Sequence, residues 1–279
     1  INIHIDKDAL LRSGIMLPKT IRHLKGEDLK DAIPDKLYIP LTDIRMLTKV
    51  DLLMLEMLAN CNWERPLYLA ISVGSVSKLK FDNYFVQEGL AFRFTPFDYK
   101  KWGDVGENRL YAVDVERLYD NVMNRYKYGG LDTPGLYLDE TTLRTCWYHR
   151  RLFAQLAKEL IAQGDNERAK KVLAYAEQVI PGYNVPETHE SGSYDIATAY
   201  AALGEKTKAV TLAVHYINWA FSLKGNRIEM VRNDCIYKFW QWNQYNELLK
   251  KIDGEKYKES NRRFEEKYAL FAPTMNYKN

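Results

Sequence analysis

A pattern of two successive helices recurs in this chain after 40 residues, and it restricts the possible folds more than any other feature. The first copy covers residues 150–181 and has two apolar stripes at helical spacing, separated by Gly164. Glycine at that place predicts a helix end, because glycine adopts the left-handed conformation at low cost. Five positions recur in register: Leu156, Ala157, Leu160, Gly164 and Ala169 correspond to Ile196, Ala197, Tyr200, Gly204 and Ala209. The sequence therefore predicts two consecutive antiparallel helix pairs.

The pattern resembles the tetratricopeptide repeat (TPR), in which two antiparallel helices form a unit of about 34 residues. The longer period of this chain fits the polar loop at 182–189, which separates the two copies. Small side chains at Ala157 and Ala169 predict that the helices of a pair approach closely. Arrays of this kind form extended surfaces that bind other molecules, so the resemblance implies a role in binding and assembly.

Residues before the repeats predict a mixed arrangement of strands and helices. Alternating or continuous apolar runs indicate strands, and such runs occur at residues 1–5, 36–41, 67–73 and 90–94. The run at 67–73 is continuous enough to predict a strand covered on both faces. A helix is expected to begin at Thr48, because Asp51 completes a capping-box pattern. One apolar face of this helix is predicted from Val50, Leu53, Met54, Met57 and Leu58.

The expected fold class is α+β, with a small N-terminal α/β domain followed by an all-α TPR-like helical-repeat domain. We place the α/β domain at residues 1–100, with a sheet of three or four strands. Residues 101–138 are expected to form a connecting segment with one amphipathic helix capped by Asp114. Residues 139–279 form the repeat domain, which starts with a helix capped by Asp139. It ends in C-terminal capping helices, expected over 228–252 and 256–271, the second of mixed charge and solvated.

Composition excludes several classes of function. The chain has 279 residues and a net charge of +3 with both signs interspersed, so it offers no strong field for nucleic acid. Its longest apolar run, at 67–73, is far shorter than the ~18 residues that a membrane helix needs, so no direct membrane insertion is expected. The chain begins with Ile1, and we expect it to be part of a longer protein that carries the signal for its compartment.

No catalytic residue, metal site or cofactor is predicted. The five histidines and three cysteines lack the spacings of zinc sites and of a disulfide framework. The sequence also lacks glycine-rich phosphate loops and the nucleophile elbow of hydrolases. Adjacent acids such as Asp139 and Glu140 could serve a glycosidase, but a helix cap and a first-turn acid explain them more simply. We expect no enzymatic activity of this chain alone and leave the activity of the parent protein open.

Two groups of residues are candidates for binding. Tyr194 and Tyr200 lie in the repeats, where exposed rings stack on sugars or grip an extended peptide and buried rings pack between helices. Further aromatic candidates there are Tyr216, Trp219, Trp240 and Trp242. The segment 119–150 joins the two expected domains, a favoured place for ligands. Its candidates are Asn121, Asn124, Tyr126, Tyr137, Asp139, Arg144 and Arg150.

A structural interpretation of this segment is the simpler one. Asp139 can serve only as a helix cap, and Arg144 and Arg150 can pair with nearby acids. The functional interpretation requires these side chains to converge on one concave surface near Tyr126 and Tyr137. The sequence leaves both interpretations standing.

Three local patterns point to a family that this chain resembles. They are Asn62–Tyr68 (NWERPLY), Leu118–Lys127 (LYDNVMNRYK), and Tyr137–Glu140 (YLDE) followed by Arg144. The patterns look like the soluble C-terminal part of large bacterial multi-spanning membrane proteins of unknown function. The membrane half of those proteins resembles protein O-mannosyltransferases of the GT-C type, and a vertebrate relative with a TPR tail is an O-mannosyltransferase. The resemblance covers roughly residues 40–225.

The resemblance implies an extracytoplasmic accessory domain that helps a membrane-embedded glycosyltransferase bind its acceptor or a partner. The catalytic carboxylate of GT-C enzymes lies in their membrane half, so the resemblance supplies no catalytic residue here. The implied partners are a protein or glycan acceptor and the membrane half, and the implied location is the periplasmic face of a bacterial inner membrane. Two alternatives stay open: a stand-alone TPR-type scaffold for protein–protein interaction, and a carbohydrate-active enzyme with two carboxylates about 5–10 Å apart.

Overall fold

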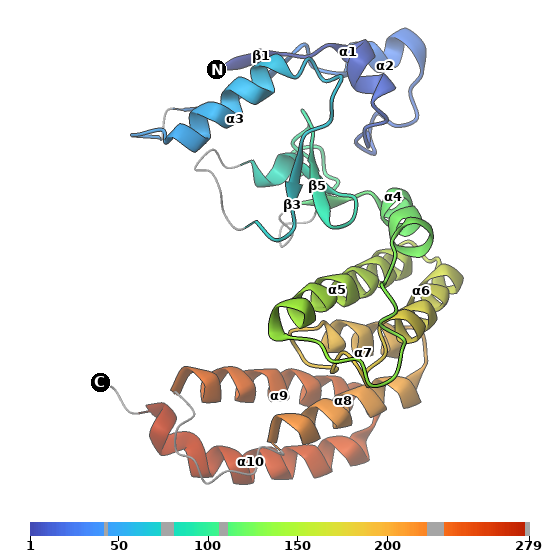
Figure 1. Ribbon diagram of the computed structural model, residues 1–279, viewed down its shortest axis with the longest axis vertical. Helices are drawn as coiled ribbons and strands as arrows, with labels where there is room; N and C mark the ends of the chain where they lie inside the picture. Colours follow the sequence, from blue (N-terminus) through green and yellow to red (C-terminus); the bar gives the residue numbers. More distant parts are fainter. Residues whose placement is uncertain (42–43, 74–80, 106–110, 222–231, 277–279) are drawn as a thin grey trace. The chain divides into compact units, whose positions relative to one another are not determined.

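The chain forms two compact units in this computed structural model, which describes residues 1–41, 44–73, 81–105, 111–221 and 232–276. The division falls between Arg125 and Tyr126, inside the stretch predicted as a connecting segment. The first unit combines small sheets with short helices, and the second consists of paired helices (Figure 1). The predicted fold class, a mixed α/β region followed by helical repeats, is confirmed.

The strands of the first unit form two sheets within the described residues. In the first sheet, β1 (Asn2–His4) and β2 (Lys36–Tyr38) pair antiparallel and bury Ile3 opposite Leu37. The second sheet has the order β3-β5-β4-β6, in which β4 and β6 are parallel and the other neighbours antiparallel. Its strands are β3 (Tyr68–Ala70), β4 (Phe85–Gln87), β5 (Ala91–Phe94) and β6 (Ala112–Val113). The predicted strand segments contain β1, β2, β3 and β5, whereas the short β4 and β6 are not predicted.

The prediction of a strand covered on both faces at 67–73 is wrong. β3 lies at the edge of its sheet, where β5 is its partner. Tyr68 and Ala70 are exposed, and Leu69 between them is half-buried. An edge strand has a neighbour on one side only, so a continuous apolar run is not sufficient evidence for a central strand. The uncovered side chains of β3 border a groove instead.

Helix α3 (Lys49–Asn60) begins with the predicted capping box. The Thr48 hydroxyl accepts from the Asp51 backbone N–H at 3.3 Å, and the Asp51 carboxylate accepts from the Thr48 N–H at 2.7 Å. Because Thr48 satisfies this carboxylate, α3 buries Asp51 together with Leu55 and Leu58. The apolar face predicted for this helix is therefore wrong in part. Three of its members are exposed: Val50, Leu53 and Met57.

The other helical segments of the first unit are short. They are α1 (Lys7–Arg12), α2 (Gly26–Ala32), the 3-10 helix η1 (Asp82–Tyr84), α4 (Val115–Asp120) and the π-helical turn η2 (Asn121–Arg125). Asp114 caps α4 as predicted, because its carboxylate accepts from the Arg117 N–H at 3.0 Å. The core of this unit contains the fully buried side chains of Ile5, Leu10, Val86, Phe97 and Tyr99.

The second unit is built from pairs of helices that follow one another in the chain (Figure 1). The pairs are α5 (Glu140–Ala162) with α6 (Asn166–Val179), α7 (Ser193–Ala202) with α8 (Lys206–Phe221), and α9 (Arg232–Ile252) with α10 (Gly254–Asn276). The helix predicted over 228–252 is found as α9, although residues 228–231 lie outside the described residues. Among the described helices, none combines the length and the apolar character that crossing a bilayer requires.

The helix predicted over 256–271 is found as α10, but its expected solvated character is wrong in part. Phe264 on α10 packs edge-on against Trp242 on α9, with ring centroids 5.4 Å apart. Phe271 also packs against the core of which Trp242 is part. Although α10 is of mixed charge, one of its faces is apolar and packs against α9 to complete the last helix pair.

The two predicted repeats have the same turn geometry. Gly164 and Gly204 occupy the left-handed region, with φ of 81° and 80°. The residue after each glycine donates its N–H to a carbonyl five positions earlier: Asp165 to Leu160 and Glu205 to Tyr200, both at 2.9 Å. The side chains of Ala169 and Ala209 are fully buried within their pairs. Equivalent glycines, turn bonds and buried alanines support the predicted 40-residue repeat.

Candidate functional site

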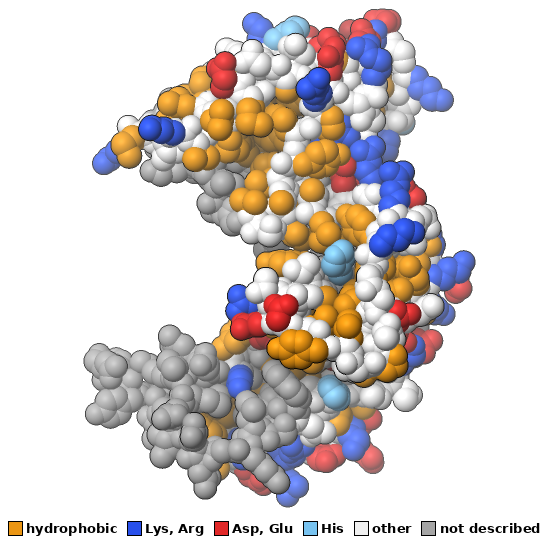
Figure 2. Space-filling view, viewed as in Figure 1, with side chains coloured by type: hydrophobic (Ala, Val, Ile, Leu, Met, Phe, Trp, Pro, Cys, Tyr) orange, Lys and Arg blue, Asp and Glu red, His pale blue; other side chains and the backbone are white. Residues whose placement is uncertain are grey.

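An open apolar groove lies between helix α3 and the four-stranded sheet of the first unit. It has a volume of about 280 Å³. All of its lining side chains are apolar or aromatic: Val50, Met54, Met57, Leu58, Leu67, Tyr68, Leu69, Val73, Phe81, Phe85 and Phe94. Figure 2 shows apolar side chains gathered over α3 and the neighbouring strands. A groove of this kind is suited to an apolar ligand or to a side chain of a partner.

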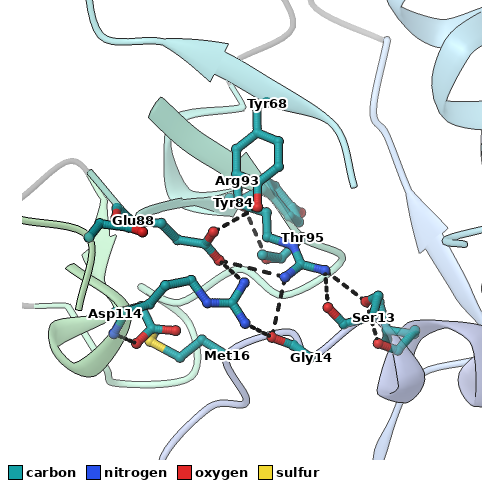
Figure 3. A network of polar contacts seen from close by, with 12 residues as sticks. Ser13, Gly14, Met16, Tyr68, Tyr84, Glu88, Arg93, Thr95 and Asp114 are labelled. Atoms are coloured by element: carbon teal, nitrogen blue, oxygen red, sulfur yellow. Dashed lines mark hydrogen bonds and ion pairs between the residues drawn. The ribbon is translucent and has the colours of Figure 1, made fainter. Parts of the chain in front are cut away.

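Tyr68 connects this groove to a buried cluster of charges. Its ring lines the groove, and its hydroxyl donates a hydrogen bond of 2.7 Å to the Glu88 carboxylate (Figure 3). Burial, and then this hydrogen bond to Glu88, raise the pKa of the Tyr68 phenol above its ordinary value. The phenol therefore remains protonated at neutral pH and acts as a hydrogen-bond donor. The hydrogen bond to Glu88 therefore holds the Tyr68 ring in its place at the groove.

The Glu88 carboxylate is shared by two arginines. Arg117 donates to it at 3.0 Å, and the Arg93 guanidinium lies 3.6 Å from the same oxygen. Arg93 also donates to the Ser13 carbonyl at 2.9 Å and to the Gly14 carbonyl at 3.2 Å (Figure 3). The network thus ties β5 and α4 to the end of α1 around one buried carboxylate. Its polar groups are used to hold elements together.

Two of the predicted binding residues, Asn121 and Asn124, belong to the first unit. The Asn121 amide donates to the Glu88 carbonyl at 2.7 Å, so η2 is attached to the same segment as the charge cluster. The Asn124 amide donates to the Asp120 carboxylate at 3.0 Å, within one helical turn. Asn121 thus joins distant segments, whereas the partner of Asn124 is local.

The predicted residues at the start of α5 lie on the surface of the second unit. The Asp139 carboxylate caps the helix, accepting from the N–H groups of Thr141 at 2.8 Å and Thr142 at 3.2 Å. The Thr142 hydroxyl, followed by these backbone bonds, lowers the pKa of Asp139. Arg144 pairs with Glu140 at 2.5 Å, one turn away. Tyr137 is 88% exposed.

Arg150 is buried and holds the polar loop between the two repeats. Its guanidinium donates to three backbone carbonyls and one hydroxyl. The acceptors are Ile180 at 2.8 Å, Val185 at 2.6 Å, Pro186 at 2.9 Å and Ser191 Oγ at 3.2 Å. Burial lowers the pKa of Arg150 to about 10, so the side chain is still charged at neutral pH. The loop folds back onto α5 because this one cation satisfies its carbonyls.

Three predicted tyrosines make contacts inside the second unit. The Tyr126 ring packs edge-on against His149, with centroids 5.8 Å apart. Tyr200 is buried, and its hydroxyl donates to the Glu177 carboxylate across the helix pairs. Tyr194 is half-buried and stacks on His189 at 5.9 Å. Of these three, Tyr194 belongs to a larger aromatic cluster that reaches the surface.

That cluster was not predicted as a whole. His189 contacts the rings of Tyr237 and Trp240 on α9 as well as Tyr194 on α7. Trp240 was a candidate from the sequence, whereas His189 and Tyr237 were not. Tyr237 and Trp240 are three residues apart, a helical spacing that could have indicated a common face. His189 comes from the loop and has no periodicity that reveals its position. The side chain of Trp219 lies outside the described residues.

Comparisons with known proteins identify part of the chain. Residues 1–116 match a family model described as TMEM260-associated domain 2. No curated protein and no solved structure match the chain. The matched region contains the apolar groove and Glu88 and Arg93 of the charge cluster. It includes residues 1–39, where the sequence patterns gave no resemblance, and it stops short of the helix pairs. Residues 1–116 of the first unit are therefore similar to a domain associated with TMEM260.

Proposed function

We propose that this chain is the extracytoplasmic accessory region of a membrane-embedded glycosyltransferase that resembles protein O-mannosyltransferases. In this role it binds an acceptor or a partner and leaves sugar transfer to the membrane half. The observation that carries the proposal is the match of residues 1–116 to TMEM260-associated domain 2. The sequence patterns that resemble the same kind of membrane protein lie both inside and beyond the matched region.

The architecture of each unit supports a binding role. The first unit has an apolar groove that is open to solvent, with Val50, Met57 and Tyr68 about half exposed at its rim. The second unit has the paired helices from which binding surfaces of repeat proteins are built. Grooves and helical arrays both offer area for partners at little cost in backbone rearrangement.

The charged groups of the first unit also support a role without chemistry of its own. Catalytic carboxylates need access to a substrate. Glu88 is instead buried and engaged by Tyr68, Arg93 and Arg117. Asp51, a buried acid of α3, is engaged by Thr48. These acids stabilise the fold, and we assign the transfer reaction to the membrane half.

The exposed members of the predicted binding segment belong to this proposal. Tyr137 and Arg144 present their side chains to solvent, which a contact with a partner requires. Arg150, Tyr200 and Asp139 have structural partners that already account for their positions. The location on the periplasmic face of a bacterial inner membrane follows from the same resemblance.

A transfer assay on membranes tests the proposal. Membranes that contain the full-length parent protein are compared with membranes in which the parent lacks this chain, and with the purified chain alone. We expect transfer to the acceptor by the full-length protein, a strong loss on removal of the chain, and none by the chain alone. Turnover by the purified chain that a single Asp or Glu substitution abolishes would contradict the proposal. Undiminished transfer without the chain would favour an independent scaffold.

A further inference from the structure

Four aromatic rings form an accessible surface in the second unit. Tyr237 and Trp240, about one turn apart on α9, stack with centroids 5.7 Å apart and an interplanar angle of 18°. Tyr237 is 48% exposed and Trp240 is 50% exposed. The His189 ring meets both at steep angles, at 6.4 and 5.8 Å, and stacks on Tyr194 at 5.9 Å. We name these four rings the His189 surface.

The His189 surface rests on a rigid layer of buried residues. Tyr245 is fully buried, packs edge-on against Tyr194 at 5.3 Å and stacks on Tyr216 at 4.4 Å. Tyr216 donates its hydroxyl to the side-chain carbonyl of Gln241, the residue after Trp240. These contacts fix the helices that carry the exposed rings, so a ligand meets a surface that is already arranged.

Two carboxylates, those of Glu190 and Asp195, lie near this surface. The Gln241 amide donates to the Glu190 carboxylate at 3.1 Å, which holds that acid next to α9. Glu190 and Asp195 are the charged groups that act on His189. Burial lowers the pKa of His189, and the two acids oppose this effect only in part. The imidazole is therefore neutral at neutral pH and does not cancel the two carboxylates.

We propose that the His189 surface binds a basic side chain, arginine or lysine, of a partner protein. The cation lies over the Trp240 ring, and Glu190 and Asp195 supply the opposite charge. Cations are attracted to the faces of tryptophan more than to other rings. Arginine suits the site best, because its planar guanidinium stacks on a ring and keeps its donors for carboxylates. The proposal deepens the proposed function, on which it rests for the identity of the partner as the acceptor.

The charge of the surface favours a basic side chain over a sugar. A sugar ring also stacks on tryptophan, but it is neutral and gains little from the charge of the two carboxylates. A cation gains from both the ring and the acids. The experiment therefore includes a glycoside, so that binding of a sugar would be detected.

Nuclear magnetic resonance of the purified chain with labelled tryptophan indoles gives a direct test. The probes are a capped pentapeptide with one central arginine among glycines, the same peptide with norleucine in place of arginine, and methyl α-mannoside. We expect the arginine peptide to shift the Trp240 indole signal in a saturable way that weakens with added salt. Signals of the other tryptophans serve as internal references. The norleucine peptide and the glycoside should leave Trp240 unchanged.

Variants of the purified chain distinguish the contribution of the Trp240 ring to peptide binding from that of the Glu190 carboxylate. Trp240→Leu should weaken arginine-peptide binding about fivefold or more, measured by isothermal titration calorimetry because the reporting indole is absent, while Trp240→Phe retains part of the affinity. Glu190→Gln keeps the size of the side chain and should weaken binding about threefold and reduce the salt dependence. Tyr183→Leu removes an exposed ring elsewhere in the unit and should change nothing. Unchanged circular dichroism of each variant shows that it is folded.

Three results would overturn the inference. Equal binding of the norleucine peptide would show an apolar surface, binding of the glycoside alone would show a sugar surface, and no response of Trp240 would show no site. None of these results affects the transfer assay. Loss of transfer on removal of the chain, with no peptide binding, would refute this inference alone. Peptide binding with transfer that does not depend on the chain would refute the proposed function alone.

Discussion

The hydroxyl of Tyr68 donates a 2.7 Å hydrogen bond to the Glu88 carboxylate, 20 residues further along the chain. The bond joins the rim of an apolar groove to the buried charge cluster behind it. The Tyr68 ring therefore lines the candidate site, whereas its hydroxyl is part of the hydrogen-bond network that stabilises the fold. Changes in the cluster should reach the groove through this residue.

Replacement of Glu88 by glutamine should destabilise the first unit by about 3–5 kcal/mol. The variant keeps the shape of the side chain but leaves the buried Arg93 guanidinium without its counter-charge, and breaking a buried ion pair costs about that much. Urea unfolding followed by circular dichroism measures the change. Glu64→Gln, at an exposed acid of the same unit, is the matched control and should stay within about 0.5 kcal/mol. Equal stability of the two variants would show that the cluster is not a structural support.

Ala169→Leu should destabilise the first helix pair by about 1–3 kcal/mol, because Ala169 of α6 is fully buried and a larger side chain at a buried position overpacks the helix pair. Ala209→Leu at the corresponding position of the second pair should behave alike. Thermal unfolding checks both, with Ala162→Leu on the exposed end of α5 as the control. An unchanged melting temperature at either buried position would contradict close contact in that pair.

Substitutions of Arg144 and Arg150, both on α5, should differ in their effect on stability. Arg144→Ala removes only an exposed pair with Glu140 and should change stability by at most about 0.5 kcal/mol. Arg150→Lys cannot satisfy all four acceptors of Arg150 and should cost about 1–3 kcal/mol.

The Arg144→Ala substitution is also made in the full-length parent protein, and its sugar-transfer activity is measured. Loss of transfer by a stable Arg144→Ala variant would support its role in binding. Normal transfer by that variant would remove Arg144 from the site. A fully stable Arg150→Lys variant would show that the loop does not depend on the guanidinium.

Acid should weaken the second unit before its carboxylates titrate. Burial lowers the pKa of His149, and burial also dominates the lowered pKa of His189, relative to the ordinary value of 6.5. The unfolded chain then binds more protons than the folded chain below pH 6.5, so the free energy of unfolding falls as pH falls through that value. Unfolding measured between pH 7.5 and 5, with histidine titration by nuclear magnetic resonance, checks this. Titration midpoints above 6.5, or a gain in stability on acidification, would contradict the prediction.

Local hydrogen-bond patterns made much of the fold predictable. The caps at Thr48, Asp114 and Asp139 each depend on a backbone N–H two or three residues away, so the sequence contains both partners of the bond. The turn at Gly164 depends on its own backbone conformation. Helix ends and the repeat register followed from these short-range relationships.

The candidate sites depend on contacts that the sequence does not reveal. The groove exists because α3 buries Asp51 and leaves Met57 exposed, and a helix that is apolar on two sides does not indicate which side is buried. Arg150 finds its acceptors 30 to 41 residues away, in a loop with no periodic pattern. His189 and Trp240 meet only after three helices have packed. Burial and long-range pairing, rather than local propensity, decide these positions.

The kinetics of acceptor use by the full-length parent protein test the central claim most directly. Trp240→Leu and Glu190→Gln lie in the proposed acceptor surface, and transfer rates are measured over a range of acceptor and of sugar-donor concentrations. A binding role predicts a higher KM for the acceptor, with kcat and the KM for the donor unchanged. A fall in kcat with an unchanged acceptor KM would contradict the account, because it would place this chain in the chemical step.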